Sequence, residues 1–122
     1  MNKDEFENLV RTALDDIPPE YAQKLVNVEI VVEYLPTKEQ RDNLHLSQNT
    51  LLFGLYTGIP QTKRGEGYTF VLPDKITIFQ KSIEMVARTD EEIKKKVKDT
   101  VLHEIGHHFG LSDQELHHTK VG

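Results

Sequence analysis

The sequence predicts an α+β fold in which a helix, about four short strands and a long helix follow one another. Three patterns lead to this prediction. Apolar residues recur at helical spacing in residues 3–17, alternate with polar ones in residues 26–34, and recur at helical spacing again in residues 89–109. A chain of 122 residues has the length of one domain, so we assign residues 1–122 to a single unit.

The composition suits a globular protein with a modest core, since 37% of the residues are hydrophobic and 29% are charged. A net charge of -5 argues against nucleic acid as a partner, and we expect the basic run at residues 94–98 to be a solvated helix face. The chain has no cysteine, which excludes disulfides and thiolate metal ligands. It shows neither a signal peptide nor an apolar run of roughly 18 residues. We therefore expect a cytoplasmic protein without a membrane partner.

The first third of the chain predicts a helix followed by a strand. Residues 3–17 carry one apolar stripe that ends at a pair of prolines, as expected for a helix packed on the core. A short helical turn over residues 19–25 follows. Residues 26–34 then alternate, which predicts a half-buried strand with Val26 and Tyr34 at the two ends of its apolar side.

The middle of the chain is less regular. Residues 35–49 are polar and predict a loop with about one helical turn, in which His45 is a surface residue and not a metal ligand. Residues 50–57 are apolar and predict a second strand, where Gly54 indicates a bulge or a close approach of another backbone. The glycine-rich residues 58–67 form either a loop that faces a substrate or the tip of a hairpin.

Two further strands and two helices complete the prediction. Residues 68–72 and 75–79 predict the third and fourth strands, and residues 80–87 predict a short helix. Thr89 and Glu92 have the spacing of a capping box, so a helix of about five turns begins there. The apolar stripe of this helix consists of Ile93, Val97, Val101, Ile105 and Phe109, with Leu102 alongside it.

The long helix carries a candidate metal site. His103 and His107 are four residues apart, so their imidazoles project from one face of the helix, away from the middle of the apolar stripe. This separation suits two ligands of one small ion. Gly110 can end the helix in a left-handed conformation, and the chain can then bring Asp113 back to the ion. We therefore predict a metal centre held by His103, His107 and Asp113.

Glu104, which follows the first of these histidines, is the candidate catalytic residue. Three protein ligands leave the fourth position of Zn²⁺ open for water, which is typical of catalytic sites and not of structural ones. The pKa of a metal-bound water falls toward about 7, and Glu104 can accept its proton and later return it to a leaving amine. The pattern predicts hydrolysis of peptide bonds with Glu104 as the general base.

Three other histidines lie close to this site in the sequence. His108 is turned by about 100° around the helix from His107, so we do not expect it to bind the same ion. His117 and His118 stay open as alternative or additional ligands, although the ends of chains are commonly mobile. Imidazole N–H groups that do not face the metal are expected to donate hydrogen bonds to carboxylates or backbone carbonyls.

With these residues in view, the chain resembles the zincin metallopeptidases. His-Glu-x-x-His-x-x-Gly-x-x-Asp, at residues 103–113, looks like the metzincin signature with aspartate in place of the third histidine, as in the snapalysin-like enzymes. The whole chain looks more closely like a member of the bacterial minimal zincin family, mainly through residues 55–60 and 107–113. The resemblance implies Zn²⁺ as cofactor, a peptidase-like site, and an α+β fold whose small mixed sheet packs on an N-terminal helix and a long active-site helix.

Two features depart from the metzincin pattern. Metzincins carry a methionine turn after the motif, whereas Met1 and Met85 both precede it. Nine residues follow Asp113, so we expect no C-terminal subdomain. A peptide or protein substrate would then lie along an edge strand of the sheet, paired by backbone hydrogen bonds. Tyr56 and Tyr68 are the candidates for a group that stabilises the transition state.

Two other functions stay open. Zinc endoribonucleases of ribosomal RNA maturation share the spacing of the ligands, but they lack the glutamate, end in a third histidine and favour basic clefts. Glu104, Asp113 and the net charge of -5 argue against them. The second alternative is a catalytically silent zinc-binding interaction module, against which Glu104 argues because metal binding alone does not need a base.

Overall fold

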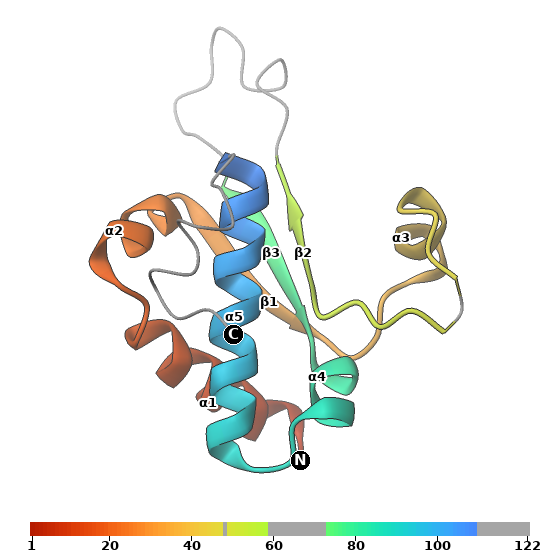
Figure 1. Cartoon of the computed structure of the whole chain (residues 1–122), viewed down its shortest axis with the longest axis horizontal. Helices are drawn as coiled ribbons and strands as arrows, with labels where there is room; N and C mark the ends of the chain where they lie inside the picture. The colour runs from red at the N-terminus through yellow and green to blue at the C-terminus, as the bar shows by residue number, and fades with distance from the viewer. Residues whose placement is uncertain (48, 59–72, 110–122) are drawn as a thin grey trace, which may run out of the picture.

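In the computed structural model, which describes residues 1–47, 49–58 and 73–109, the long helix lies across a mixed sheet of three strands (Figure 1). The strands are β1 (Val28–Glu33), β2 (Gly54–Thr57) and β3 (Asp74–Phe79). The helices are α1 (Lys3–Asp15), α2 (Pro19–Ala22), α3 (Lys38–Asn43), α4 (Gln80–Val86) and α5 (Asp90–Phe109), with a 3₁₀ turn, η1 (Gln23–Leu25), after α2. The predicted α+β class is confirmed.

The sheet has the strand order β1-β3-β2. β3 lies in the centre, parallel to β1 and antiparallel to β2, and its Ile76, Ile78 and Phe79 are completely buried. Among the strands of the described ranges, β2 therefore lies at an edge of the sheet. Residues 68–72, which the sequence predicts as a further strand, lie outside the described residues, as do residues 59–67 of the glycine-rich loop.

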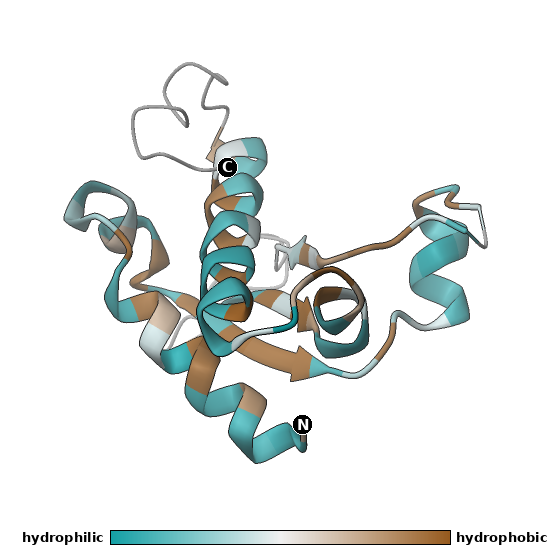
Figure 2. Cartoon of the chain, turned by 60° about the horizontal axis from the view of Figure 1, so that its bottom comes forward, coloured by the Kyte–Doolittle hydropathy of each residue, from teal (hydrophilic) through white to brown (hydrophobic). Residues whose placement is uncertain are grey.

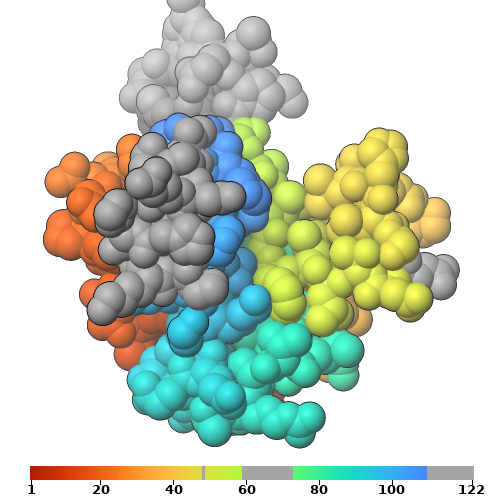
Figure 3. Space-filling model, viewed as in Figure 1, coloured from red at the N-terminus to blue at the C-terminus, as the bar shows by residue number. Residues whose placement is uncertain are grey.

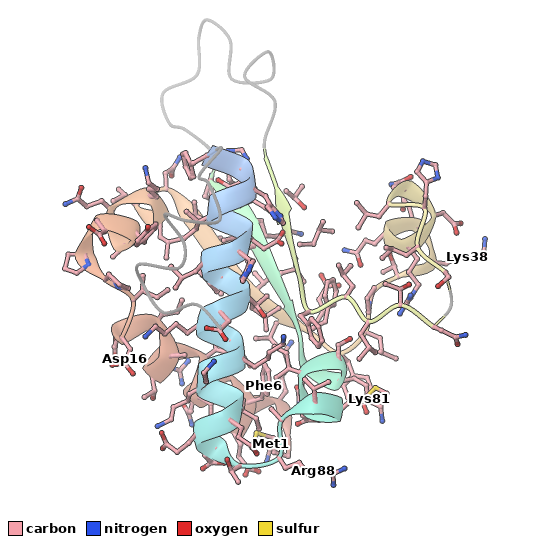
Figure 4. The ribbon with its side chains drawn as sticks, viewed as in Figure 1. Met1, Phe6, Asp16, Lys38, Lys81 and Arg88 are labelled. Carbon is pink, nitrogen blue, oxygen red and sulfur yellow. The ribbon has the colours of Figure 1, made fainter. Side chains whose placement is uncertain are left out.

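The core lies between the sheet, α1 and α5. Phe6, Val10 and Ala13 of α1 are buried there, and Figure 2 shows hydrophobic residues along the strands and at intervals along α5. Gln80 of α4 donates a hydrogen bond to the Met1 carbonyl at 3.0 Å, which holds the N-terminus against that helix; Met1 and Phe6 are labelled in Figure 4. The predicted N-terminal helix thus packs on the core of the chain itself.

The strand predicted for residues 26–34 is shorter in the structure, and both of its terminal residues are exposed. Val26 is 85% exposed because its backbone is helical and closes η1, so extended structure begins only at Val28. Tyr34 is 56% exposed because it follows the last residue of β1, and its ring lies under the ammonium of Lys81 at 5.9 Å. The half-buried strand between them is as predicted.

The second predicted strand, residues 50–57, is also shorter. Only residues 54–57 form β2, although the Phe53 carbonyl already accepts a hydrogen bond from the Phe79 N–H. The guanidinium of Arg41, in α3, donates to the carbonyls of Ser47 and Thr50 at 3.2 and 3.1 Å. These bonds hold the preceding segment beside α3 and away from the sheet. His45, just after α3, is exposed, as predicted.

α5 begins with the predicted capping box. The Glu92 N–H donates to the Thr89 hydroxyl at 3.1 Å, and the Thr89 N–H donates to the Glu92 carboxylate at 3.0 Å. The apolar stripe is buried as expected, except that Phe109, in the last turn, is 44% exposed and lies under the ammonium of Lys24 at 5.0 Å. Among the helices of the described ranges, none is sufficiently long and apolar to span a membrane.

Gly54 allows β2 to approach α5 closely. A Cβ atom at this position would lie 2.5 Å from the Thr100 Cγ2 atom and 3.3 Å from the Thr77 carbonyl oxygen. Real Cβ contacts of 2.5 Å do not occur, so any larger residue must push the edge strand away from the helix or displace Thr100. The close approach that the sequence indicates at Gly54 is confirmed.

We predict that Gly54→Ala lowers the free energy of unfolding by about 1–3 kcal/mol, as is typical of overpacking. Thr100→Ser removes the methyl group in question and keeps the hydroxyl that donates to the Lys96 carbonyl at 2.7 Å. Urea unfolding of both single variants and the double variant gives their coupling energy. The explanation is wrong if Gly54→Ala is equally destabilising with threonine and with serine at position 100.

Candidate metal and catalytic site

The last two turns of α5 bring three of the predicted site residues together. His103 and Glu104 are half-buried and His107 is exposed, while Val101 and Ile105, on the opposite side of the helix, are completely buried. The ring centroids of His103 and His107 are 6.4 Å apart, with the ring planes at 72°. The two imidazoles thus project from one accessible face, as the i, i+4 spacing requires.

The third predicted ligand, Asp113, lies outside the described residues, as do the alternatives His117 and His118. Within residues 1–47, 49–58 and 73–109, no group of three histidine or acidic side chains is arranged to hold a metal ion. The described part of the site therefore supplies a pair of imidazoles, and a complete three-ligand centre needs a contribution from residues outside the described ranges.

A hydrogen bond orients the first histidine. The Nδ1 atom of His103 lies 2.8 Å from the Asp99 carbonyl oxygen, one turn earlier in α5. Because a carbonyl oxygen only accepts, Nδ1 is the nitrogen that carries a proton, and in the neutral imidazole Nε2 then has the lone pair. This is the arrangement of metal-binding histidines, in which a hydrogen bond on one ring nitrogen fixes the tautomer that leaves the other free for the ion. The donor set fits Zn²⁺, which favours imidazole and carboxylate ligands.

Glu104 connects α5 to the edge strand. Its Oε1 atom accepts a hydrogen bond from the Tyr56 N–H of β2 at 2.8 Å. Burial raises the pKa of the Glu104 carboxyl, an effect that the Tyr56 N–H and the nearby His107 and His103 oppose. A carboxylate with a raised pKa accepts a proton more readily at neutral pH than an exposed one does. The environment of Glu104 thus suits a base.

Tyr56 is held by two residues of α5. Its N–H donates to Glu104, and its ring stacks on the imidazole of His108, with centroids 3.9 Å apart and planes at 13°. Glu104 and His108 are one helical turn apart, so both face β2. Sequence reasoning about metal ligands left His108 without a role, although its i, i+4 relation to Glu104 was a usable signal.

The two tyrosines predicted as candidates for transition-state stabilisation have different outcomes. The Tyr56 hydroxyl donates to the Asp74 carboxylate of β3 at 2.8 Å. Its position is therefore set by the sheet, and its proposed catalytic role stays a prediction. Tyr68 lies outside the described residues.

A cavity of about 300 Å³ lies beside Glu104, between the residues that lead into β2 and the exposed face of α5. Figure 3 shows this face of the molecule, where the segment before the glycine-rich loop lies against α5. The cavity is lined by Leu51, Leu52, Phe53, Gly54, Lys96, Asp99, Thr100, His103 and Glu104. A small ligand group held in this space would contact both the candidate base and one candidate metal ligand.

The sequence is similar to a known protein family over most of its length. A family model described as a zincin-like metallopeptidase matches residues 25–122, which cover β1 to α5 and the C-terminal residues. No curated protein matches the chain. The matched range includes the edge strand, Glu104 and all three predicted metal ligands. This chain therefore belongs to the zincin-like metallopeptidase family.

Proposed function

We propose that the chain is a zinc-dependent peptidase, with His103, His107 and Asp113 as the metal ligands and Glu104 as the general base. The observation that carries this proposal is the position of Glu104. Its half-buried carboxylate is fixed by the N–H of an edge strand, on the helix face that presents both imidazoles, and it lines an open cavity. A purely structural metal site would not need a carboxylate held in this way.

The residues of the chain divide the chemistry between them. Zn²⁺ bound by these ligands would lower the pKa of a water molecule and polarise the carbonyl of the substrate. Glu104 would take a proton from the attacking water and deliver it to the leaving amine. Its raised pKa favours the first transfer, and the hydrogen bond from Tyr56 holds the carboxylate in one orientation for both transfers.

The edge strand offers a binding surface for an extended peptide. The Phe53 carbonyl bonds to β3, and backbone groups alternate in direction along a strand. The Tyr56 N–H accordingly faces away from β3, where it meets Glu104. A peptide that added to this edge by backbone hydrogen bonds would pass the candidate base. We therefore propose a peptide or protein substrate along β2.

The alternative of a catalytically silent interaction module has the same metal site as the proposed peptidase. The two differ only in whether the chain hydrolyses peptides. An endoribonuclease is less compatible with the charges of α5, because two lysines of its basic run, Lys94 and Lys95, are paired with Glu91 and Asp99 at 2.8 and 3.0 Å. Paired lysines contribute little to binding a phosphate backbone. The experiments below separate metal binding from hydrolysis.

The metal site predicts that the purified, zinc-supplied protein holds about one zinc per chain, and that His107→Ala and Asp113→Ala lose it. Elemental analysis after gel filtration measures the content. His45→Ala, which removes an exposed histidine far from α5 in sequence, is the control and should retain zinc. Full zinc content in Asp113→Ala would refute the proposed ligand set. No zinc in the wild type would refute the proposal that the chain is a zinc-dependent peptidase.

The general base predicts that Glu104→Gln retains zinc but hydrolyses peptides roughly 10²–10⁴-fold more slowly. The assay is cleavage of a mixed peptide library by the zinc-loaded protein, followed by mass spectrometry. Zinc binding with no cleavage by the wild type would favour the interaction module. Equal cleavage by the wild type and Glu104→Gln would exclude Glu104 as the base.

The raised pKa of Glu104 also predicts a pH-dependent stability difference in the metal-free protein. Ionised Glu104 is disfavoured in the fold, so its ionisation costs stability once the pH exceeds its ordinary pKa of 4.5. Glu104→Gln should therefore be more stable than the wild type at pH 7, and the difference should disappear at pH 4. Denaturant unfolding in chelator at both pH values tests this, and a less stable variant at pH 7 contradicts it.

A further inference from the structure

Three consecutive lysines of α5 have different surroundings. The ammonium of Lys94 pairs with Glu91 at 2.8 Å, and that of Lys95 pairs with Asp99 at 3.0 Å. The ammonium of Lys96 instead lies 4.0 Å from the centroid of the Phe53 ring, at the wall of the cavity beside Glu104. The sequence predicts one solvated basic face, but Lys96 is half-buried and turned toward the candidate site.

Lys96 is the one lysine in the described lining of this cavity, and its charge is not paired with that of a described carboxylate. Asp99, the other charged residue near Lys96 in the lining, has a side chain only 13% exposed and is already paired with Lys95. Glu104, at the other end, accepts the Tyr56 N–H. In the described ranges no carboxylate forms an ion pair with Lys96. A positive charge thus stands at the wall of this cavity beside the side chains of Leu51, Leu52 and Phe53, in a chain whose net charge is -5.

The distance from Lys96 to Glu104 suits recognition of a side chain near the cleaved bond. Eight residues separate them in α5, or about 12 Å along the helix axis. An extended peptide covers about 3.3 Å per residue, so this span corresponds to about three or four residues of substrate. A second cavity, of about 190 Å³, shares Lys96 and Asp99 with the first and continues toward Val86 and Ala87. A peptide can therefore extend past Lys96.

We propose that the cavity binds an acidic side chain of the substrate and that Lys96 determines this specificity, an inference that rests on the proposed peptidase function. Leu51, Leu52 and Phe53 would contact the apolar stem of a glutamate, and the Lys96 ammonium would pair with its carboxylate. An apolar substrate side chain in the cavity would remove water from the Lys96 ammonium without offering it a hydrogen-bond acceptor. A basic side chain would be repelled by its charge. The Phe53 ring holds the ammonium in place through a cation–π contact.

The test is direct binding of short, fluorescein-labelled, alanine-rich peptides to zinc-loaded Glu104→Gln protein, which does not consume them. Glutamate, glutamine or lysine is placed at each position in turn, and fluorescence anisotropy gives Kd. At one or two adjacent positions glutamate should bind about tenfold more tightly than glutamine, as expected for a charge-assisted hydrogen bond. Lysine at the same positions should bind more weakly than glutamine.

Variants of Lys96 separate this site from general electrostatics. Lys96→Met keeps the apolar stem of the side chain and should abolish the preference for glutamate. Lys96→Arg keeps the positive charge and should preserve the preference. Lys96→Glu should make the protein prefer lysine at that position of the peptide. Lys94→Met is the matched control, since it removes a neighbouring positive charge that Glu91 already pairs, and it should leave the preference unchanged. Thermal unfolding verifies that each variant is folded.

Three results would overturn the proposal. These are equal loss of the preference in Lys96→Met and Lys94→Met, binding without any preference for glutamate, and no binding of any peptide. Two further measurements distinguish failure of the proposed glutamate site from failure of the proposed peptidase function. These are the same titrations with metal-free protein and the cleavage assay. If the chain prefers glutamate but cleaves no peptide, the proposed glutamate site is supported and the proposed peptidase function is wrong. If it cleaves peptides without this preference, the peptidase function is supported and the glutamate site is wrong.

Discussion

The close contact between β2 and α5 is the constraint on which the candidate site depends. Because Gly54 has no side chain, the edge strand lies against Thr100 and brings the Tyr56 N–H within 2.8 Å of the Glu104 carboxylate. The buried stripe on the other side of α5 fixes the rotation of the helix about its axis. Together these contacts decide that Glu104 faces the strand, and that His103 and His107 face the open side.

This arrangement has a cost in stability. Glu104 is half-buried, and no lysine or arginine of the described residues forms an ion pair with it. Such a carboxylate resists ionisation, and a single backbone N–H only partly compensates for the lost water. Proteins retain such destabilising groups mainly where function requires them. The stacking of Tyr56 on His108 and the hydrogen bond from its hydroxyl to the Asp74 carboxylate offset part of the cost and keep the strand in place.

Local patterns predicted most of the fold and the chemistry of α5. The capping box at Thr89, the buried stripe and the i, i+4 spacing of His103 and His107 depend only on helical geometry. The length of β2 and the surroundings of Lys96 depend on residues distant in sequence. Arg41 binds the carbonyls that precede β2, and Phe53 draws Lys96 toward the cavity. These contacts join segments that are distant in sequence, so a pattern within one segment cannot predict them. The sequence therefore predicted a longer second strand and a solvated Lys96.

α5 carries the candidate base, the candidate metal ligands His103 and His107, and Lys96. A helix is a rigid element, and groups on it keep fixed separations. Asp99 contacts two residues of this helix: its carbonyl oxygen accepts the hydrogen bond that orients His103, and its carboxylate pairs with Lys95. The candidate base, two of the three candidate metal ligands and Lys96 thus all lie on one helix, and Gly54 lets the strand β2 approach that helix closely.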